Sequence, residues 1–244
     1  MSISSTLDRL HLQAKENRWF RYFAVFNRLA LAAGFIPSGM VKILGERFAS
    51  GVNANHPMGH YLEALHTTSY YYTFIGVVQV TAAILLLIPR TTTLGAFLYF
   101  PIILNICILT FAVRFDGSLF TAPLMVLANL YLLCWDYDKW KFILPFNHPA
   151  IADAIPKQKS LSNKFPIKFF AGVVAAVIVF MLVIPKLYDV LPKNSLLQCQ
   201  KQFKGNNRTK ADDDFCNCVH TNGEPLDKCL DEYEKAADDT IGTP

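Results

Sequence analysis

The sequence carries little charge for its length. Asp, Glu, Lys and Arg make up 17% of the 244 residues, whereas hydrophobic residues make up 52%. An ordinary soluble domain is excluded, because such domains carry roughly a quarter charged residues. A disordered chain is excluded too, because disordered chains are poor in hydrophobic residues. The composition therefore indicates an integral membrane protein.

Several functional signatures are also missing. The chain has no Gly-rich phosphate loop, nucleophile elbow or Ser/His/Asp pattern, so hydrolase and nucleotide chemistry have no support. No pair of carboxylates lies inside the apolar segments, which counts against a proton-coupled transporter. The first residues lack the uncharged run and small-residue cleavage site of a secretory signal peptide. Basic charge is not concentrated on a soluble segment, so a nucleic-acid partner is not expected.

The apolar stretch 24–45, AVFNRLALAAGFIPSGMVKILG, organises the chain. Its 22 residues are long enough as a helix to cross a hydrocarbon core of ~30 Å at ~1.5 Å per residue. Its only charged residues, Arg28 and Lys42, lie near its two ends, where we expect both side chains to snorkel to the interface. Pro37 removes one backbone donor, so a neighbouring helix must satisfy the freed carbonyl.

One face of this helix carries small residues four apart and ends in a Lys–Glu pair. The face comprises Ala30, Gly34, Ser38, Lys42 and Glu46. Small residues allow a neighbouring helix to approach closely in lipid. The pair has the spacing of a helical ion pair, although in the less favourable order. It would either bind an anionic or quinol-like head or close the rim of the bundle.

Four further apolar segments cover residues 70–89, 93–115, 119–135 and 167–188. The sequence therefore predicts an all-α integral membrane protein. Its parts are an interfacial helix over 1–23, a four-helix transmembrane bundle over 24–135, a Lys-rich loop over 136–166, a fifth transmembrane helix over 167–188 and a small, helical, disulfide-bonded tail over 189–244.

Charge is divided unevenly along the chain, whose net charge is +4. Residues from 189 onward hold 7 Lys/Arg and 11 Asp/Glu, a net of −4, so the first 188 residues carry +8. The positive-inside rule places the N-terminus and the Lys-rich loop in the cytoplasm and the acidic tail outside. We expect a multi-pass protein of a bacterial inner membrane with a cytoplasmic N-terminus and a periplasmic C-terminus.

Cysteine usage supports the same orientation. Four of the six cysteines lie in the tail: Cys199, Cys216, Cys218 and Cys229. A tail this small needs cross-links to be stable, and an oxidising compartment supplies them. We expect two disulfides in one of three connectivities, of which a Cys216–Cys218 bridge is the least comfortable. A redox-active Cys-x-Cys pair is the alternative, although redox motifs usually have two intervening residues. The two cysteines in spans, Cys107 and Cys134, are expected to act as small hydrophobic residues.

Polar residues inside the spans are candidates for a binding site, because burying them in lipid is costly. A cavity lined by Ser38, Lys42, Gln79, Asn105 and Asn129 would be polar enough for a quinone headgroup or water. The alternative is that these groups form hydrogen bonds between helices and fix their register. No other cofactor is suggested by the sequence.

The polar connection between the first two spans contains a weak candidate for a metal site. His60, Glu63 and His66 are spaced by three residues, so a metal could bridge two of them on adjacent helical turns. The spacing is not that of the zinc proteases, and no cysteine is near. A solvated interfacial helix is the more common interpretation of such a pattern.

The first four spans resemble the DoxX family of small membrane proteins over roughly residues 20–140. The resemblance lies in the hairpin QVTAAILLLIPRTTTLGAFLY at 79–99 and in Arg28, Gly34-Phe35, Ser38-Gly39 and Lys42 of the first span. It implies a four-helix bundle. Members of the family are described as subunits of quinone-linked oxidases acting on sulfur compounds, as parts of redox or thiol-stress assemblies, and as assembly factors. The fifth span and the cysteine-containing tail depart from the family pattern.

Two functions are consistent with these observations. The first is an accessory or structural subunit of a membrane complex, whose tail docks a membrane or periplasmic protein outside the cytoplasm. The second is a quinone-binding subunit of a membrane redox system. No catalytic constellation is visible, so the sequence favours the first.

Overall fold

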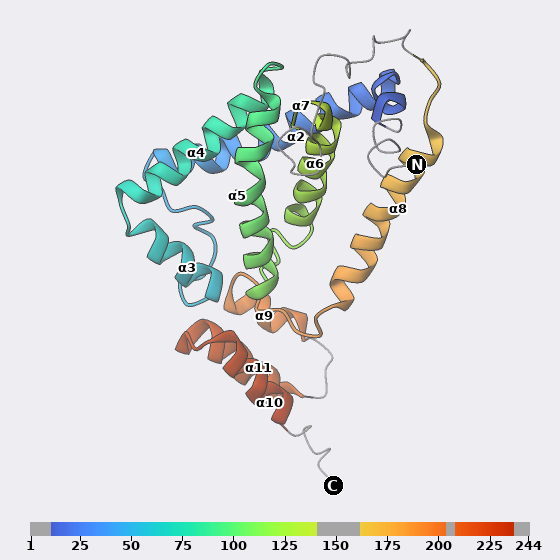
Figure 1. The fold of residues 1–244 in the computed structure, drawn as a ribbon. Coiled ribbons are helices and arrows are strands. Elements are labelled where there is room, and N and C mark those ends of the chain that lie inside the picture. The colour runs from blue at the N-terminus through green and yellow to red at the C-terminus, as the bar shows by residue number, and fades with distance from the viewer. Residues whose placement is uncertain (1–10, 141–161, 204–207, 237–244) are drawn as a thin grey trace. The chain divides into compact units, whose positions relative to one another are not determined.

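The computed structural model describes residues 11–140, 162–203 and 208–236 (Figure 1). Within these ranges the secondary structure is helical apart from one isolated bridge between Asn17 and Ser162. The predicted all-α class is confirmed for this part of the chain. The helices are α2 (Arg18–Ile43), α3 (Pro57–His66), α4 (Tyr70–Leu87), α5 (Thr92–Ala112), α6 (Thr121–Trp135), α7 (Tyr137–Trp140), α8 (Ile167–Val183), η2 (Ile184–Lys186), α9 (Leu196–Gln202), α10 (Thr209–Asn217), η3 (Cys218–Asn222) and α11 (Leu226–Lys235).

Three of these helices, α2, α4 and α5, are long and apolar enough to cross a membrane. The apolar helices α6 and α8 have 15 and 17 residues and are shorter than their predicted spans. Helix α2 begins at Arg18, before the predicted start of the first span at residue 24. Two parts of the prediction lie outside the described residues. They are residues 1–10 of the predicted interfacial helix and residues 141–161 of the predicted Lys-rich loop.

The chain divides into two compact units. The first unit contains the described parts of 1–37, 78–103 and 124–179, and the second contains those of 38–77, 104–123 and 180–244. Five helices contribute residues to both units: α2, α4, α5, α6 and α8.

Polar side chains in the first unit bond to backbone carbonyls. The Nε and Nη2 groups of Arg28 donate to the carbonyl oxygens of Leu86 and Leu87 at 2.7 and 2.8 Å. These carbonyls end α4 and have no partner within the helix, and a cation at a helix C-terminus also complements the helix dipole. These two bonds hold the Arg28 side chain at the C-terminal end of α4, and its predicted position at the membrane interface stays a prediction.

Two further bonds connect α5 to its neighbours in the first unit. The buried Tyr99 hydroxyl donates to the Leu31 carbonyl at 3.1 Å, and its ring stacks on Phe35 at 3.6 Å. Asn129 of α6 is fully buried, and its Nδ2 donates to the Ala96 carbonyl at 3.0 Å. Interhelical bonds of this kind fix helix register in lipid.

In the second unit, α2 and α4 approach each other at glycine. A Cβ atom added to Gly76 would lie 2.6 Å from the carbonyl oxygen of Gly39 and 2.8 Å from the Cβ of Lys42. Only a residue without a side chain fits this contact. Gly34 of the predicted small-residue face has a close neighbour too, but its nearest atom is the flexible end of Met125, at 2.6 Å from an added Cβ.

Replacing Gly76 by alanine is expected to destabilise the protein by about 1–3 kcal/mol, because backbone must move to admit the methyl group. Gly172 is the matched control, since it also lies in an apolar helix and an added Cβ there meets nothing within 4 Å. Gly172→Ala should be neutral or stabilising by up to about 1 kcal/mol through helix propensity. Thermal unfolding of both variants in detergent measures the difference. Equal melting temperatures would contradict the close contact.

The tail forms a small core around its cysteines. The structure pairs Cys199 with Cys216 and Cys218 with Cys229, in agreement with the predicted two disulfides. All four cysteines are buried, together with Phe215 and other apolar side chains of the tail. The two disulfides and a small apolar cluster therefore stabilise a segment that is too short to form a large hydrophobic core.

Candidate functional site

Backbone carbonyls of the tail accept hydrogen bonds from other segments of the second unit. The Asn55 side-chain amide donates to the carbonyls of His220 and Thr221 at 2.9 and 3.1 Å. The backbone amide of Asn53 donates to the Asn194 carbonyl at 2.9 Å. These bonds seat the tail against the loop that precedes α3.

Two further contacts join this part of the chain to residues at and after the end of α5. Lys193 forms an ion pair with Asp116 at 3.2 Å, and the Tyr188 hydroxyl donates to the Phe111 carbonyl at 3.2 Å. The ion pair is partly exposed and contributes little by itself. The neutral bonds to backbone carry more of the stability, since each satisfies a polar group that is partly removed from water.

Two buried histidines lie where the tail meets α3. His56 is fully buried and caps α3, its Nδ1 accepting from the Met58 amide at 2.9 Å. His220 is 4% exposed and its Nε2 bonds the Pro192 carbonyl at 2.6 Å. The two ring centroids are 5.9 Å apart. The second nitrogen of each ring is buried with no hydrogen-bond partner in the described residues. Two imidazoles this close and this buried favour their neutral forms.

Burial lowers the pKa of His56 to about 4, and the neighbouring His220 and His60 act in the same direction. Burial also lowers the pKa of His220, although its bond to Pro192 opposes the change. The unfolded chain takes up protons below a pH of about 6.5, whereas folded His56 does so only near pH 4. Stability should therefore be full above pH 6.5 and fall between pH 6.5 and 4.

We expect acidification from pH 7 to 4.5 to remove about 2–3 kcal/mol from the stability of the second unit. His56→Asn should flatten this dependence, because asparagine retains the N-cap acceptor and does not titrate. Thermal unfolding of both proteins at the two pH values measures the effect. Equal losses in the wild type and the variant would show that His56 is not the titrating group.

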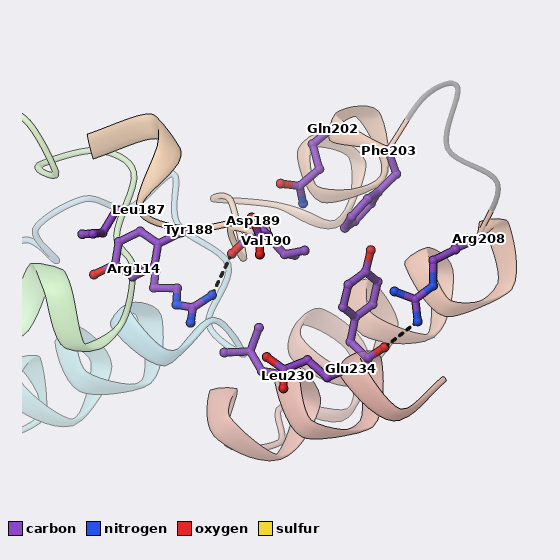
Figure 2. A pocket seen from close by; sticks show the side chains of 11 residues that line it. Arg114, Leu187, Tyr188, Asp189, Val190, Gln202, Phe203, Arg208, Leu230 and Glu234 are labelled. Carbon is purple, nitrogen blue, oxygen red and sulfur yellow. Dashed lines mark hydrogen bonds between the residues drawn. The ribbon is translucent and has the colours of Figure 1, made fainter. Parts of the chain in front are cut away.

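A pocket of about 750 Å³ lies in the second unit between the segment after α8 and the tail helices. Figure 2 shows Arg114 and Arg208 approaching it from opposite sides. The lining residues are Arg114, Leu187, Tyr188, Asp189, Val190, Gln202, Phe203, Arg208, Leu230, Tyr233 and Glu234. Two arginines, two carboxylates and several apolar side chains therefore converge on one cavity.

Both arginines are held by an aromatic ring and a carbonyl. The guanidinium of Arg114 lies 4.5 Å from the Tyr188 ring centroid, and its Nη1 donates to the Val190 carbonyl at 3.1 Å. That of Arg208 lies 4.8 Å from the Tyr233 centroid, and its Nη2 donates to the Tyr233 carbonyl at 2.9 Å and also to the Ala236 carbonyl. A guanidinium has five N–H groups in a planar fork that suits carboxylate and phosphate. These contacts fix both guanidinium groups at the pocket, which the carboxylates of Asp189 and Glu234 also line.

The backbone of Arg114 is unusual. It follows α5 with φ +50°, a left-handed conformation that favours glycine. The amide of Arg114 bonds to the Phe111 carbonyl and that of Phe115 to the Thr110 carbonyl, the pattern of a helix C-terminus that normally ends in glycine. Ala49, Ser69 and Lys193 share this left-handed conformation, so the backbone by itself assigns no role to the Arg114 side chain.

The residues predicted to line a polar cavity are placed differently. Lys42 is buried, but its Nζ donates to the Ser38 carbonyl at 2.8 Å and lies 4.3 Å from the Phe48 ring centroid. Glu46 is exposed and forms no ion pair with Lys42, so the predicted pair is wrong. Asn105 is also exposed, which removes it from any interior site.

The two buried amides fall in the first unit. Gln79 is 3% exposed, and its Oε1 has no hydrogen-bond partner among the described residues. Asn129 bonds to the Ala96 carbonyl, as the helix-register alternative expects. Neither amide lines the pocket of Figure 2.

The weak metal candidates make separate contacts. Glu63 pairs with Arg47 at 3.1 Å, and the Nε2 of His66 bonds the Gly45 carbonyl at 3.0 Å. His60 lies beside Gly223, at 3.3 Å from a Cβ built there. Among the described residues no group of three or more acidic, histidine or cysteine side chains is arranged to hold a metal ion.

Comparison with known proteins identifies one partial relative. The chain is 37% identical over 81 residues to the uncharacterized protein YwoB of Bacillus subtilis (strain 168). The match covers 33% of this chain and 51% of YwoB, so the chain spans about half the length of that relative. No family model matches the chain, and no solved structure matches it. The DoxX resemblance stays a prediction.

Sequence reasoning missed the pocket because its residues are dispersed. Arg114 follows an apolar run and has the pattern of an interfacial charge, and Arg208 is one cation in a polar tail. A sequence signal exists for Arg208, a basic residue within the net acidic segment from residue 189 onward, but Arg114 lies outside that segment. Their convergence depends on the disulfide-bonded tail, whose connectivity the sequence left open.

Proposed function

We propose that the chain is a DoxX-like accessory subunit of a bacterial inner-membrane complex, anchored by a four-helix bundle and a fifth helix. Its N-terminus lies in the cytoplasm and its disulfide-bonded tail lies outside. The tail receives a segment of a partner protein in the pocket of Figure 2. The observation that carries the proposal is the convergence of Arg114 and Arg208 on this cavity.

The chemistry of the pocket supports a peptide ligand with an acidic side chain. The two guanidinium groups supply donors for a carboxylate, and charge-assisted bonds of this kind are stronger than neutral ones. Leu187, Leu230 and Phe203 add an apolar wall. A peptide with an acidic residue beside apolar ones would satisfy both surfaces, as in other complexes where a charged group is bound at an apolar groove.

The left-handed backbone of Arg114 makes glycine a suitable substitution for testing whether the guanidinium binds the partner. Arg114→Gly removes the guanidinium and its bond to the Val190 carbonyl, but it also relieves the left-handed backbone. Because the second effect offsets the first, the protein should still fold and lose its partner. Ser69→Gly is the matched control, because Ser69 also has a left-handed conformation (φ +55°) in the second unit and does not line the pocket. A photo-crosslinking amino acid at Leu230 reports what occupies the pocket in living cells.

We expect one crosslinked protein in the wild type and in Ser69→Gly, and an at least tenfold weaker product in Arg114→Gly, since one lost charge-assisted contact costs about 1.5–3 kcal/mol. Reduction of the tail disulfides should also abolish the product. Equal crosslinking in the two glycine variants, or crosslinks to lipid alone, would overturn the proposal.

The quinone-binding alternative stays a prediction of the sequence. It is tested by solvent extraction of the purified protein and chromatography of the extracted lipids. A stoichiometric quinone would favour it over the accessory subunit.

A further inference from the structure

A second pocket lies in the first unit, at the ends of α2, α6 and α8. Its volume is about 450 Å³, and its walls include Phe20, Tyr131, Trp135, Trp140 and Phe169. Phe20 and Phe169 pack edge to face with centroids 4.7 Å apart. This pocket is separate from the one that the proposed function uses, and its role is independent of that function.

Two of the polar wall residues, Tyr131 and Trp140, bond to the protein's own backbone. The Tyr131 hydroxyl donates to the Phe20 carbonyl at 3.0 Å, and the Trp140 indole nitrogen donates to the Leu133 carbonyl at 2.8 Å. These donors are already used, so the walls mainly present the faces and edges of rings. Such a surface favours a hydrocarbon chain over a ligand that needs several hydrogen bonds.

The carboxylates close to this pocket are already neutralised. Asp136 is buried and accepts from Thr93 at 2.6 Å and from Lys139 at 3.0 Å. Asp138 bonds His11 at 3.2 Å and lies 3.5 Å from the Nζ of Lys15. The acidic side chains therefore offer little negative charge to an incoming ligand.

Four exposed cations lie on or next to α2 and α8, two helices that contribute to the pocket, and are not neutralised. Arg18, Arg21, Lys164 and Lys168 form no ion pair within the part of the chain that the structure describes. Arg21 directly follows the wall residue Phe20, and Lys168 directly precedes the wall residue Phe169. The side chain of Asn17 donates to the Lys164 carbonyl at 2.7 Å and brings that segment beside the start of α2.

We propose that this pocket holds one acyl chain of an anionic phospholipid, whose phosphate binds the four cations. The apolar aromatic walls suit the chain, and the unpaired charges suit the headgroup. Exposed Trp19 and Tyr22 on the same turn of α2 are of the type that lies at the headgroup level of a bilayer. A zwitterionic phospholipid would satisfy the walls but not the cations.

The thiol of Cys134 lines the pocket and serves as a probe of occupancy. The experiment uses a Cys107→Ala background, in which Cys134 is the one free thiol of the described residues. The protein is reconstituted in vesicles of phosphatidylcholine, with and without phosphatidylglycerol, and the rate of maleimide labelling is measured. Phosphatidylglycerol should slow labelling by about fivefold, because an occupied pocket shields the thiol.

A variant with Arg18, Arg21, Lys164 and Lys168 all replaced by glutamine should lose this protection. Its matched control replaces three exposed tail lysines by glutamine and should keep it: Lys201, Lys228 and Lys235. Equal labelling rates in the two kinds of vesicle, or protection that persists in the four-glutamine variant, would overturn the proposal.

A second measurement does not depend on labelling. Mass spectrometry of gently extracted protein should find phosphatidylglycerol retained by the wild type and lost from Cys134→Trp, in which the indole fills the pocket. Retention of a quinone in place of the phospholipid, or equal retention by both proteins, would also overturn it.

Discussion

Replacing Cys216 by serine is expected to destabilise the tail by about 3 kcal/mol, a large fraction of the stability of so small a segment. The bridge to Cys199 closes a loop with a sequence separation of 17, and the cysteines it joins lie at the centre of the tail core. The variant removes this constraint and places a hydroxyl in the buried cluster. Both effects favour the unfolded tail.

Limited proteolysis in detergent measures this loss, because an unfolded tail is cut while the apolar helices are protected. Cys134→Ser is the matched control, since Cys134 is exposed and unpaired. It should change stability by less than about 0.5 kcal/mol. Equal protease resistance of the two variants would contradict a stabilising role for the Cys199–Cys216 bridge.

Replacing Arg28 by methionine is expected to cost about 3 kcal/mol, although the substitution makes α2 more apolar. The loss arises at the end of α4, where the Leu86 and Leu87 carbonyls lose their charged donor. The Leu87 carbonyl would lose its protein donor, and the Leu86 carbonyl would keep only the Thr92 hydroxyl at 3.5 Å; a hydrogen bond to a charged group contributes about 1.5–3 kcal/mol. Arg28→Lys should restore part of the stability, since an ammonium group donates from a single point and cannot reproduce the forked contact.

Arg90 is the matched control, because it is exposed just beyond the same helix end. Arg90→Met should leave the melting temperature in detergent nearly unchanged. A similar loss in Arg28→Met and Arg90→Met would mean that overall charge, rather than capping of α4, governs stability.

Composition and hydropathy were sufficient to predict the helical class and the apolar helices α2, α4 and α5. The paired tail cysteines were also predictable, because an acidic, cysteine-rich segment has few other ways to become stable. Helix rotation was not predictable. A helix that is apolar on all sides gives no periodic signal for the face that packs. Asn105 was therefore assigned to the interior although it is exposed.

Polar partners were predicted wrongly for a related reason. Lys42 and Glu46 have the spacing of an ion pair, but a helix ends between them at Ile43. Lys42 uses the Ser38 carbonyl and the Phe48 ring instead. The partners of Arg28, the two carbonyls at the end of α4, were not predictable either, because no sequence pattern reveals them.

The pocket lined by Arg114 and Arg208 was not predictable from the sequence either. The left-handed backbone of Arg114 is a property of the folded helix end, and a glycine there would have been easier to anticipate. The pocket also needs the tail to be cross-linked in one of its three connectivities, which spacing alone did not choose. The structure gives both the conformation of Arg114 and the pairing of the tail cysteines.

We propose that the disulfide-bonded tail lies outside the cytoplasm on a membrane-anchored chain. Labelling of intact cells with a membrane-impermeant maleimide, before and after treatment with an impermeant reductant, tests this directly. We expect no labelling of the tail before reduction and labelling of all four tail cysteines after it. Labelling without reduction, or labelling that requires lysis of the cells, would contradict it.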